Sequence, residues 1–488
     1  MNVPSTPGRV VSRPRQTNTQ KAVLPALLLA CVSLTSVSRV GAQARPASTT
    51  RTMLVARIDS IAAAPVRAGA VAGIAVAVVR GRDTLLMKGY GFADLEHQVA
   101  VAPNTVFKIG SLTKQFTSAA VMQLVERKSL ALDDNINTYI PGFPTHGRTI
   151  AVRHLLNHTS GIPSYTDIGP RFGRVARTDL APDSLIQIVA NDSLQFEPGQ
   201  QFYYNNTGYF MLGMVIDKVT GRRYGDYLET NLFKQAGLTQ TRYCDSRRII
   251  PHRAQGYDRS PSGLVNTDFL SMQLPAAAGS LCSTIGDLVS WTQQLNAGRI
   301  VNAESYRQMT TPVVFANGRP MTYGFGIGAD TISGKRVISH GGAINGFNSF
   351  MSYVPQDSLV IVVLANTAPA PTSAIADAIM RSVLRLPAAP PPPAPKDLAL
   401  ASVDRDRYIG EYHLARPDGS RQPVRVFAQE EKVMASLAGQ APSPLRSQGA
   451  HVFLDGSGNR FAFDVAGSRA TGFMFGAGSR RLEAVRVR

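Results

Sequence analysis

A run of prolines and alanines, Pro-Ala-Ala-Pro-Pro-Pro-Pro-Ala-Pro at residues 387–395, divides this chain of 488 residues into two unequal parts. Such a run can continue neither a helix nor a central strand, because proline lacks a backbone N–H and its ring fixes φ. It predicts an extended, semi-rigid linker, to which we assign residues 387–396. A chain of this length also exceeds what one hydrophobic core usually serves, so two folded domains are expected.

The longer part of the chain, residues 45–386, has strand patterns at both of its ends. Residues 72–80 and 83–90 predict a hairpin whose first strand is nearly all apolar, as a core strand should be. Short β-branched or aromatic runs recur before the linker, at 337–340, 348–353 and 359–364. Neither cluster alone has enough strands to be stable, so we predict that both ends contribute to one sheet.

Helical apolar spacing occurs between the two strand clusters and after the second one, at residues 115–126, 150–157, 183–190, 209–219, 224–235, 284–295 and 371–384. The predicted fold class is therefore α/β (α+β), with an antiparallel sheet built from both ends of the domain, flanking helices and a mainly helical insertion. After the linker, residues 397–488 alternate short apolar segments with Gly, Asp and Ser. That pattern is typical of a small antiparallel β-barrel or sandwich.

The first 44 residues differ in composition from the rest of the chain. They contain basic residues, no acidic ones, and an apolar run, 22–37, that is too short for a comfortable transmembrane helix. The small-residue pattern Gly41-Ala42-Gln43-Ala44 follows. We therefore predict a signal peptide at 1–44 and an exported, periplasmic or secreted protein without a transmembrane segment in its mature chain. In an alternative interpretation, Leu28-Leu29-Ala30-Cys31 is a lipoprotein site that tethers the mature protein through Cys31.

Charge and cysteine content narrow the possible partners. The formal net charge is +18, and removing the five basic residues of 1–44 would leave +13. No Lys/Arg block and no basic stretch interleaved with aromatics accompanies this excess, so we expect a solvated basic surface and no nucleic-acid partner. The mature chain keeps only Cys244 and Cys282. In an oxidising compartment these two can form a disulfide, and the alternative is two small buried side chains.

The tetrapeptide Ser111-Leu112-Thr113-Lys114 is the only Ser-x-x-Lys in the chain and stands at the start of a predicted helix. One helical turn would place the lysine amine beside the serine hydroxyl, which needs a neighbouring base to act as a nucleophile. Burial and the helix N-terminus both lower the pKa of a lysine, and backbone N–H groups there can hold an oxyanion. Ser111 is therefore the candidate nucleophile, and Lys114 its activating neighbour.

A second candidate group is the pair Tyr204 and Asn206, directly before an apolar helical segment. A phenol near a lysine ammonium is biased toward phenolate, and so could move a proton between Ser111 and a leaving group. The asparagine amide could donate to a substrate carbonyl while its oxygen bonds the lysine. The alternative interpretation of Tyr-Asn-Asn-Thr-Gly is an ordinary surface turn.

The third candidate group, His340-Gly341-Gly342-Ala343, falls at the end of a predicted strand. Gly341 and Gly342 would let a substrate backbone approach the strand edge closely. The N–H of Ala343 could then complete an oxyanion hole with the N–H of Ser111, and His340 could donate to a substrate carboxylate or carbonyl. The alternative is a glycine-rich hairpin with a histidine that only packs.

The order of these three groups resembles that of the serine β-lactamase and penicillin-binding-protein-like superfamily, which includes class C β-lactamases, D-Ala-D-Ala carboxypeptidases and β-lactamase-like esterases. The stretches 155–161 and 206–209, Leu-Leu-Asn-His-Thr-Ser-Gly and Asn-Thr-Gly-Tyr, are also similar to family sequence. The resemblance covers roughly residues 50–385 and implies that Ser111, Lys114, Tyr204, Asn206 and His340 form the catalytic site. It also implies a lipocalin-like C-terminal domain. His340 stands where true β-lactamases usually carry a lysine that helps anchor the substrate carboxylate, so esterase or D-peptidase activity is favoured over efficient β-lactam hydrolysis.

Other chemistries have weaker support. His154 and His158 have the i, i+4 spacing of metal ligands, but Leu155 stands where a zinc protease motif needs Glu. No Gly-x-Ser-x-Gly elbow or phosphate loop occurs. We therefore expect an exported serine hydrolase that needs no metal or cofactor and forms an acyl-enzyme with an ester, a D-amino-acid peptide or amide, or a β-lactam, with cell-wall peptides among the candidate substrates. The alternative is a penicillin-binding sensor that is acylated without turnover.

Overall fold

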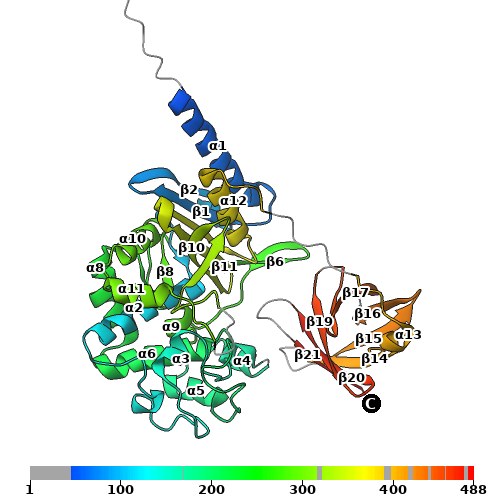
Figure 1. Ribbon diagram of the computed structural model, residues 1–488. Coiled ribbons are helices and arrows are strands. Elements are labelled where there is room, and N and C mark those ends of the chain that lie inside the picture. The colour runs from blue at the N-terminus through cyan, green and yellow to red at the C-terminus, as the bar shows by residue number, and fades with distance from the viewer. Residues whose placement is uncertain are drawn as a thin grey trace, which may run out of the picture. The chain divides into compact units, whose positions relative to one another are not determined.

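The computed structural model (Figure 1) describes residues 46–168, 170–315, 321–389, 397–415, 421–437, 441–456, 458–476 and 482–487. The predicted signal peptide, 1–44, and most of the predicted linker, 390–396, lie outside these ranges. No helix within the ranges is long and apolar enough to cross a membrane.

A seven-stranded antiparallel sheet lies at the centre of the larger domain, in the order β3-β2-β1-β12-β11-β10-β9. Its strands are β1 (Gly73–Arg80), β2 (Asp83–Asp94), β3 (Val99–Ala100), β9 (Gly328–Ile332), β10 (Lys335–Ile344), β11 (Phe347–Val354) and β12 (Leu359–Ala365). In β1, Val76 pairs with Lys88 of the adjoining hairpin strand on one side and with Val363, from the other end of the domain, on the other. The predicted sheet built from both ends of the domain is confirmed.

The two faces of this sheet pack against different helices. Val76 and Ile361 belong to one apolar cluster with residues of α1 (Pro46–Arg67) and α12 (Thr372–Leu384), and Figure 1 shows both helices beside the sheet. Ala75 and Val362, which point to the other face, belong to the main core with residues of α2 and α10. The central strands are buried on both faces, which explains their nearly continuous apolar sequences.

The helical insertion surrounds α2. Its helices are α2 (Thr113–Glu126), α3 (Val152–Leu156), α4 (Pro170–Val175), α5 (Pro182–Ala190), α6 (Asn206–Thr220), α7 (Tyr224–Leu228), the π-helical η4 (Glu229–Phe233), α8 (Lys234–Ala236), α9 (Ala276–Gly279), α10 (Ile285–Asn296) and α11 (Ala303–Thr310). Short 3₁₀ turns are η1 (Gly110–Leu112), η2 (Ile136–Thr138), η3 (Tyr165–Asp167) and η5 (Pro355–Asp357). Two small sheets complete the domain, formed by β4 (Phe107–Lys108), β8 (Leu281–Ser283) and β5 (Arg242–Tyr243), and by β13 (Thr367–Ala368), β6 (Tyr257–Ser260) and β7 (Gly263–Asn266).

Helix α2 is buried along most of its length, which fixes the position of its N-terminus. Phe116 stacks on Trp291 with ring centroids 4.0 Å apart. Two of its buried hydroxyls have partners: the Thr117 hydroxyl lies 2.7 Å from the Tyr224 hydroxyl, and the Ser118 hydroxyl 3.0 Å from that of Tyr209. A rigid, fully packed helix is a suitable element from which to position reacting groups.

The C-terminal domain is a closed eight-stranded β-barrel, so the predicted small all-β fold is confirmed. A short helix, α13 (Ser402–Asp406), precedes the strands β14 (Gly410–Ala415), β15 (Arg421–Gln429), β16 (Lys432–Leu437), β17 (Ser443–Gly449), β18 (Val452–Leu454), β19 (Arg460–Ala466), β20 (Arg469–Gly476) and β21 (Leu482–Arg486). Its core is rich in aromatic rings, among them Tyr412, Phe461 and Phe473, which are fully buried. Barrels of eight strands are just wide enough for side chains to fill them.

Candidate active site

Ser111 lies in the 3₁₀ turn η1, immediately before α2, and the end of strand β10 passes beside this turn. Two glycines permit the close approach. Gly110 has φ of +51°, and a Cβ at this residue would lie 3.0 Å from the backbone nitrogen of Ala343. A Cβ on Gly342 would lie 2.1 Å from the carbonyl oxygen of Ile109 and 3.1 Å from the nitrogen of Ser111. The backbone of the third predicted group is therefore adjacent to the candidate nucleophile.

Lys114 lies one turn into the helix with its side chain fully buried. Its Nζ is 3.1 Å from Ser111 Oγ, 2.8 Å from Asn206 Oδ1 and 2.9 Å from the carbonyl oxygen of Ala278. Burial lowers the pKa of Lys114 well below its usual value of 10.5. The lysine therefore lies beside the serine hydroxyl with its neutral form favoured.

Asn206 is positioned by the start of helix α6. The neighbouring Asn205 caps this helix, because its side-chain oxygen accepts a hydrogen bond of 2.7 Å from the N–H of Gly208. The Asn206 amide nitrogen donates to Thr166 Oγ1 at 3.0 Å, which leaves its oxygen directed at Lys114. The predicted contact between the second and the first group is thus present.

Tyr204 is partly buried and its ring lies against the lysine, with Lys114 Nζ 4.7 Å from the ring centroid. Burial raises the pKa of the Tyr204 phenol above its usual value of 10.0, although a side-chain hydrogen bond with Ser111 acts in the opposite direction. A nearby ammonium was expected to favour the phenolate. The structure instead favours the protonated phenol, because burial of the ring disfavours the charged phenolate. Burial also drives Lys114 toward its neutral form.

His340 lies at the same cleft, but both of its ring nitrogens already have partners within the protein. Its Nδ1 is 2.5 Å from the carbonyl oxygen of Gly341, and its Nε2 is 2.8 Å from the hydroxyl of Tyr323. Burial, and next the nearby Lys114, lower the pKa of His340 to about 4. In this arrangement the imidazole is neutral, and a substrate that hydrogen-bonds to it would have to displace one of these partners.

Two further residues adjoin the site. His158, which the sequence placed at a metal-ligand spacing from His154, is buried, and its ring lies 4.3 Å from that of Tyr204, centroid to centroid. Tyr323 was not predicted, since it belongs to no motif and follows no secondary-structure signal. No cluster of potential metal ligands occurs within the described residues, which include His154 and His158.

A cavity of about 900 Å³ opens beside Ser111. Ser111, Tyr204 and Asn206 lie on its wall together with the strand segment 340–345. Its charged lining residues are Asp167, Asp258 and Asp268, and within the described part of the chain no Lys or Arg lines it. Arg177, which does not line the cavity, forms an ion pair with Asp268. The cavity lining itself is therefore acidic, although the protein has a strong excess of basic residues.

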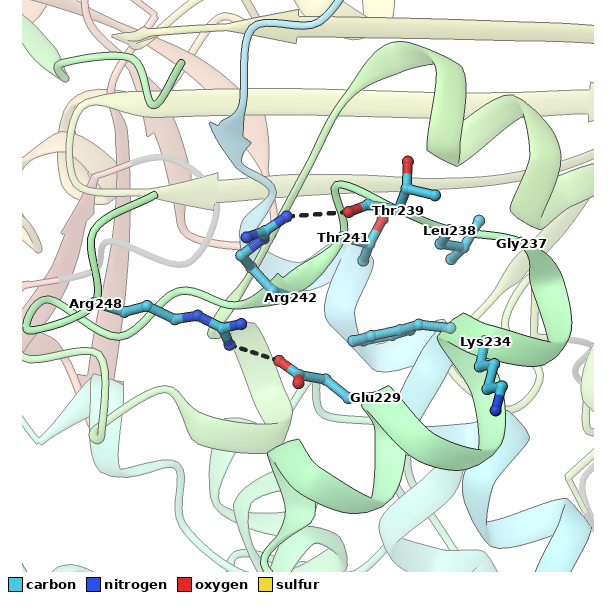
Figure 2. A pocket seen from close by; sticks show the side chains of 9 residues that line it. Glu229, Lys234, Gly237, Leu238, Thr239, Thr241, Arg242 and Arg248 are labelled. Atoms are coloured by element: carbon cyan, nitrogen blue, oxygen red, sulfur yellow. Dashed lines mark hydrogen bonds and ion pairs between the residues drawn. The ribbon is translucent and has the colours of Figure 1, made fainter. Parts of the chain in front are cut away.

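A second hollow, of about 380 Å³, lies beside η4 and is shown in Figure 2. Three of its charged side chains are engaged with neighbours: Arg248 pairs with Glu229 at 2.8 Å, and Arg242 Nη2 donates to the carbonyl oxygen of Thr239 at 3.0 Å. None of the predicted catalytic residues lines this hollow, so we place the chemistry in the larger cleft.

Cys244 and Cys282 are both fully buried and are present as free thiols, hydrogen-bonded to one another. The pairing of β5 with β8 brings them together, because Arg242 lies opposite Cys282 and the N–H of Cys244 donates to the carbonyl oxygen of Ser280 at 2.8 Å. The alternative of two small buried side chains thus describes this structure, and a disulfide between them stays a prediction for oxidising conditions.

The chain is similar to proteins of known family. A family model described as Beta-lactamase matches residues 58–384. Penicillin-binding protein 4* of Bacillus subtilis is 28% identical over 437 residues, which covers 85% of this chain and 94% of that protein. A D-aminopeptidase of Gluconobacter oxydans is 27% identical over 341 residues, covering 69% of this chain but only 64% of the relative. The solved structure of a D-stereospecific amidohydrolase from Streptomyces sp. matches with a TM-score of 0.59 and 28% identity, over 67% of this chain and 97% of that one.

Proposed function

Because the chain belongs to the Beta-lactamase family of hydrolases, we propose that it is an exported serine hydrolase that works through a covalent acyl-enzyme on Ser111. One observation carries the proposal: Lys114 Nζ lies 3.1 Å from Ser111 Oγ, at the start of a buried helix. An amine at that distance can take the hydroxyl proton as the oxygen attacks a carbonyl carbon.

The hydrogen-bond partners of Lys114 support its role as the base. A neutral amine has two N–H donors and one lone pair. The amide oxygen of Asn206 and the carbonyl oxygen of Ala278 can only accept, so they take the two donors. The lone pair then faces the hydroxyl of Ser111. This assignment agrees with the lowered pKa of Lys114.

The proposed reaction begins when Ser111 Oγ attacks the substrate carbonyl and its proton passes to Lys114 Nζ. The oxyanion forms at the N–H groups of Ser111 and Ala343, whose backbones lie side by side. The bond from the carbonyl carbon to the leaving group breaks, and the leaving group takes a proton from the phenol of Tyr204. Water then attacks the ester of Ser111 and gives up one proton to the phenolate of Tyr204. The bond from the acyl carbon to Ser111 Oγ breaks, and this oxygen takes back the proton held by Lys114, so that the acid is released and all three side chains return to their starting states.

For the substrate we propose a D-amino-acid amide or peptide, or an ester, in preference to a β-lactam. The lining of the cleft carries Asp167 and Asp258, a neutral His340 and, in its described part, no Lys or Arg, whereas Asp268 is ion-paired with Arg177. This charge pattern favours an ammonium group over a carboxylate. Relatives named D-aminopeptidase and D-stereospecific amidohydrolase point the same way. Strand β10 pairs with β9 only as far as Ser339, which leaves room for a substrate backbone beside the exposed Gly341. The space beside Gly342 is taken instead by the carbonyl oxygen of Ile109.

The test compares three chromogenic substrates: D-alanine p-nitroanilide, a short-chain p-nitrophenyl ester and a cephalosporin. We expect turnover of the anilide or the ester, little turnover of the cephalosporin, and loss of all turnover in Ser111→Ala. Hydrolysis that survives in Ser111→Ala would exclude Ser111 as the nucleophile.

A second candidate function is a sensor that is acylated by penicillin and does not turn it over. It is favoured by the alignment with penicillin-binding protein 4*, which covers 94% of that protein. A fluorescent penicillin distinguishes the two functions. Stable stoichiometric labelling without hydrolysis of any of the three substrates would support the sensor.

A further inference from the structure

A continuous chain of hydrogen bonds crosses the active site from the helical insertion to the sheet. The N–H of Asn205 lies 3.0 Å from His158 Nδ1, and His158 Nε2 lies 3.3 Å from the hydroxyl of Tyr323. That hydroxyl lies 2.8 Å from His340 Nε2, and His340 Nδ1 lies 2.5 Å from the carbonyl oxygen of Gly341. Tyr323 therefore bridges two buried histidines, one from the helical insertion and one from strand β10.

The two ends of this chain fix the position of every proton in it. The backbone N–H of Asn205 can only donate, so His158 carries its proton on Nε2 and donates it to Tyr323. The carbonyl oxygen of Gly341 can only accept, so His340 carries its proton on Nδ1 and presents a lone pair at Nε2. The Tyr323 hydroxyl must then accept from His158 and donate to His340. No other arrangement with two neutral histidines satisfies all four contacts.

The surroundings of His340 favour this neutral state. The titratable groups around it are Lys114, Tyr204, Tyr323 and His158, and none of them is a carboxylate. Burial, and next Lys114, lower the pKa values of both His158 and His340. The donated hydrogen bond from Tyr323 adds to this effect, because it requires the lone pair that protonation would remove.

We propose that Tyr323 is a positioning and specificity-determining residue, which holds His340 as the neutral Nδ1–H tautomer and so keeps the third motif free of positive charge. The consequence is discrimination against substrates that carry a carboxylate next to the scissile bond, in a cleft whose described lining has three aspartates and no Lys or Arg. The arrangement of protons depends only on the structure, whereas the discrimination rests on the proposed hydrolase function.

The arrangement of protons is tested on the wild-type protein without any substrate. In protein labelled with ¹⁵N-histidine, we expect one buried histidine with a protonated Nε2 and one with a protonated Nδ1, both unchanged between pH 8 and pH 5. Assignment uses the single variants His158→Gln and His340→Gln. Two histidines of the same tautomer, or either one becoming cationic above pH 5, would overturn the proposal even if the protein hydrolyses nothing.

The discrimination is tested with D-alanyl-D-alanine and D-alanyl-D-alaninamide, which differ only in the terminal carboxylate. In the wild type we expect the ratio of kcat/KM for the acid to that for the amide to stay constant from pH 8 to pH 5. In Tyr323→Phe the His340 lone pair loses its donor, so its pKa rises and the ratio should increase roughly fivefold at pH 5, as a charge-assisted hydrogen bond becomes available.

The matched control is Tyr224→Phe, which removes another buried tyrosine hydroxyl, bonded to Thr117 at 2.7 Å and outside the cleft. It should destabilise the protein to a similar degree and leave the substrate ratio independent of pH. The role of Tyr323 would be overturned if the ratio of kcat/KM for the acid to that for the amide changed equally with pH in the two variants. It would also be overturned if this ratio stayed constant with pH in Tyr323→Phe while the amide was hydrolysed. Absence of turnover of both peptides by the wild type would contradict the proposed substrate and leave the ¹⁵N result as the test of the hydrogen-bond chain.

Discussion

Lys114 shows how a few contacts define the chemistry of one residue. Burial alone would lower its pKa, but a buried amine without partners would also be unstable in the fold. Here two oxygen acceptors, from Asn206 and Ala278, accept hydrogen bonds from two N–H groups of the amine. The lone pair of the nitrogen is then directed toward Ser111. The site therefore stabilises the form of the lysine that can accept a proton.

Replacing Lys114 with methionine should remove the base while keeping an unbranched chain of similar length. We expect kcat to fall about 10²- to 10⁴-fold, the usual contribution of a general base. Steady-state kinetics with the preferred substrate measures the effect. Lys108→Met is the matched control, because Lys108 is a partly buried lysine whose pKa is likewise lowered by burial, and it has no described contact with Ser111. Similar losses in the two variants would argue against a specific role for Lys114.

The pKa directions predict the pH dependence of kcat/KM. Activity requires a neutral Lys114, so it should increase with pH through the pKa of that residue, which lies well below 10.5. It also requires a protonated Tyr204, whose pKa lies above 10.0, so any alkaline decline should begin only beyond that value. In Tyr204→Phe the acid limb should remain and the alkaline limb should disappear. An alkaline decline that begins near neutral pH would contradict this assignment.

At the scale of elements, the site depends on the close approach of strand β10 to the turn that carries Ser111. Gly342 allows that approach, since a Cβ there would lie 2.1 Å from the carbonyl oxygen of Ile109. Ser349 of the neighbouring strand β11 strengthens it, because its hydroxyl donates to the same carbonyl oxygen at 2.8 Å. The paired strands β10 and β11 therefore cannot move away from the turn without losing the contacts of Gly342 and Ser349 with Ile109.

Gly342→Ala should push β10 away from Ser111. We expect a loss of stability of about 1–3 kcal/mol, typical of overpacking, together with a large loss of kcat. Denaturant unfolding and kinetics measure the two effects. Gly341→Ala is the neighbouring control for stability, because the nearest atoms to its Cβ would be 3.6 and 3.8 Å away, in ordinary contact. If both substitutions lowered the stability equally, the close approach of β10 to the Ser111 turn would not be the cause of the loss.

Sequence patterns predicted the elements that have strong local signals. The long amphipathic or apolar runs gave helices close to α2, α6, α10 and α12, and the two strand clusters do form one sheet. Helix α9 (Ala276–Gly279) has only four residues and no periodic signal, yet its Ala278 supplies an acceptor for Lys114. Tyr323 likewise reaches the site only through tertiary packing, so no local pattern could have identified it.

At the scale of the whole molecule, the C-terminal barrel has a core of its own. The residues of its apolar cluster all lie between 400 and 484, and the ring of Phe473 packs against those of Phe461 and Phe463 at centroid distances of 5.2 and 5.0 Å. These rings occupy the space that a ligand would need inside a barrel of this size. A bound ligand in its interior is therefore not expected.

Phe473→Ala should remove one of the fully buried rings of this core. We expect a loss of about 3–5 kcal/mol in the unfolding free energy of the barrel, since the cavity left behind would be only partly filled. Unfolding of the isolated fragment 397–488, with and without the substitution, measures the loss. If the fragment showed no cooperative unfolding transition, the barrel would not have an independent core. If Phe473→Ala left the unfolding free energy unchanged, the core would not be filled as described.

The central claim, that Ser111 activated by Lys114 forms an acyl-enzyme, is tested most directly by rapid-quench mass spectrometry during turnover of an activated p-nitrophenyl ester. The mechanism predicts a transient mass increase equal to one acyl group, located on the peptide that contains Ser111 and absent in Ser111→Ala. Turnover of the ester without any adduct, or an adduct that persists in Ser111→Ala, would contradict it.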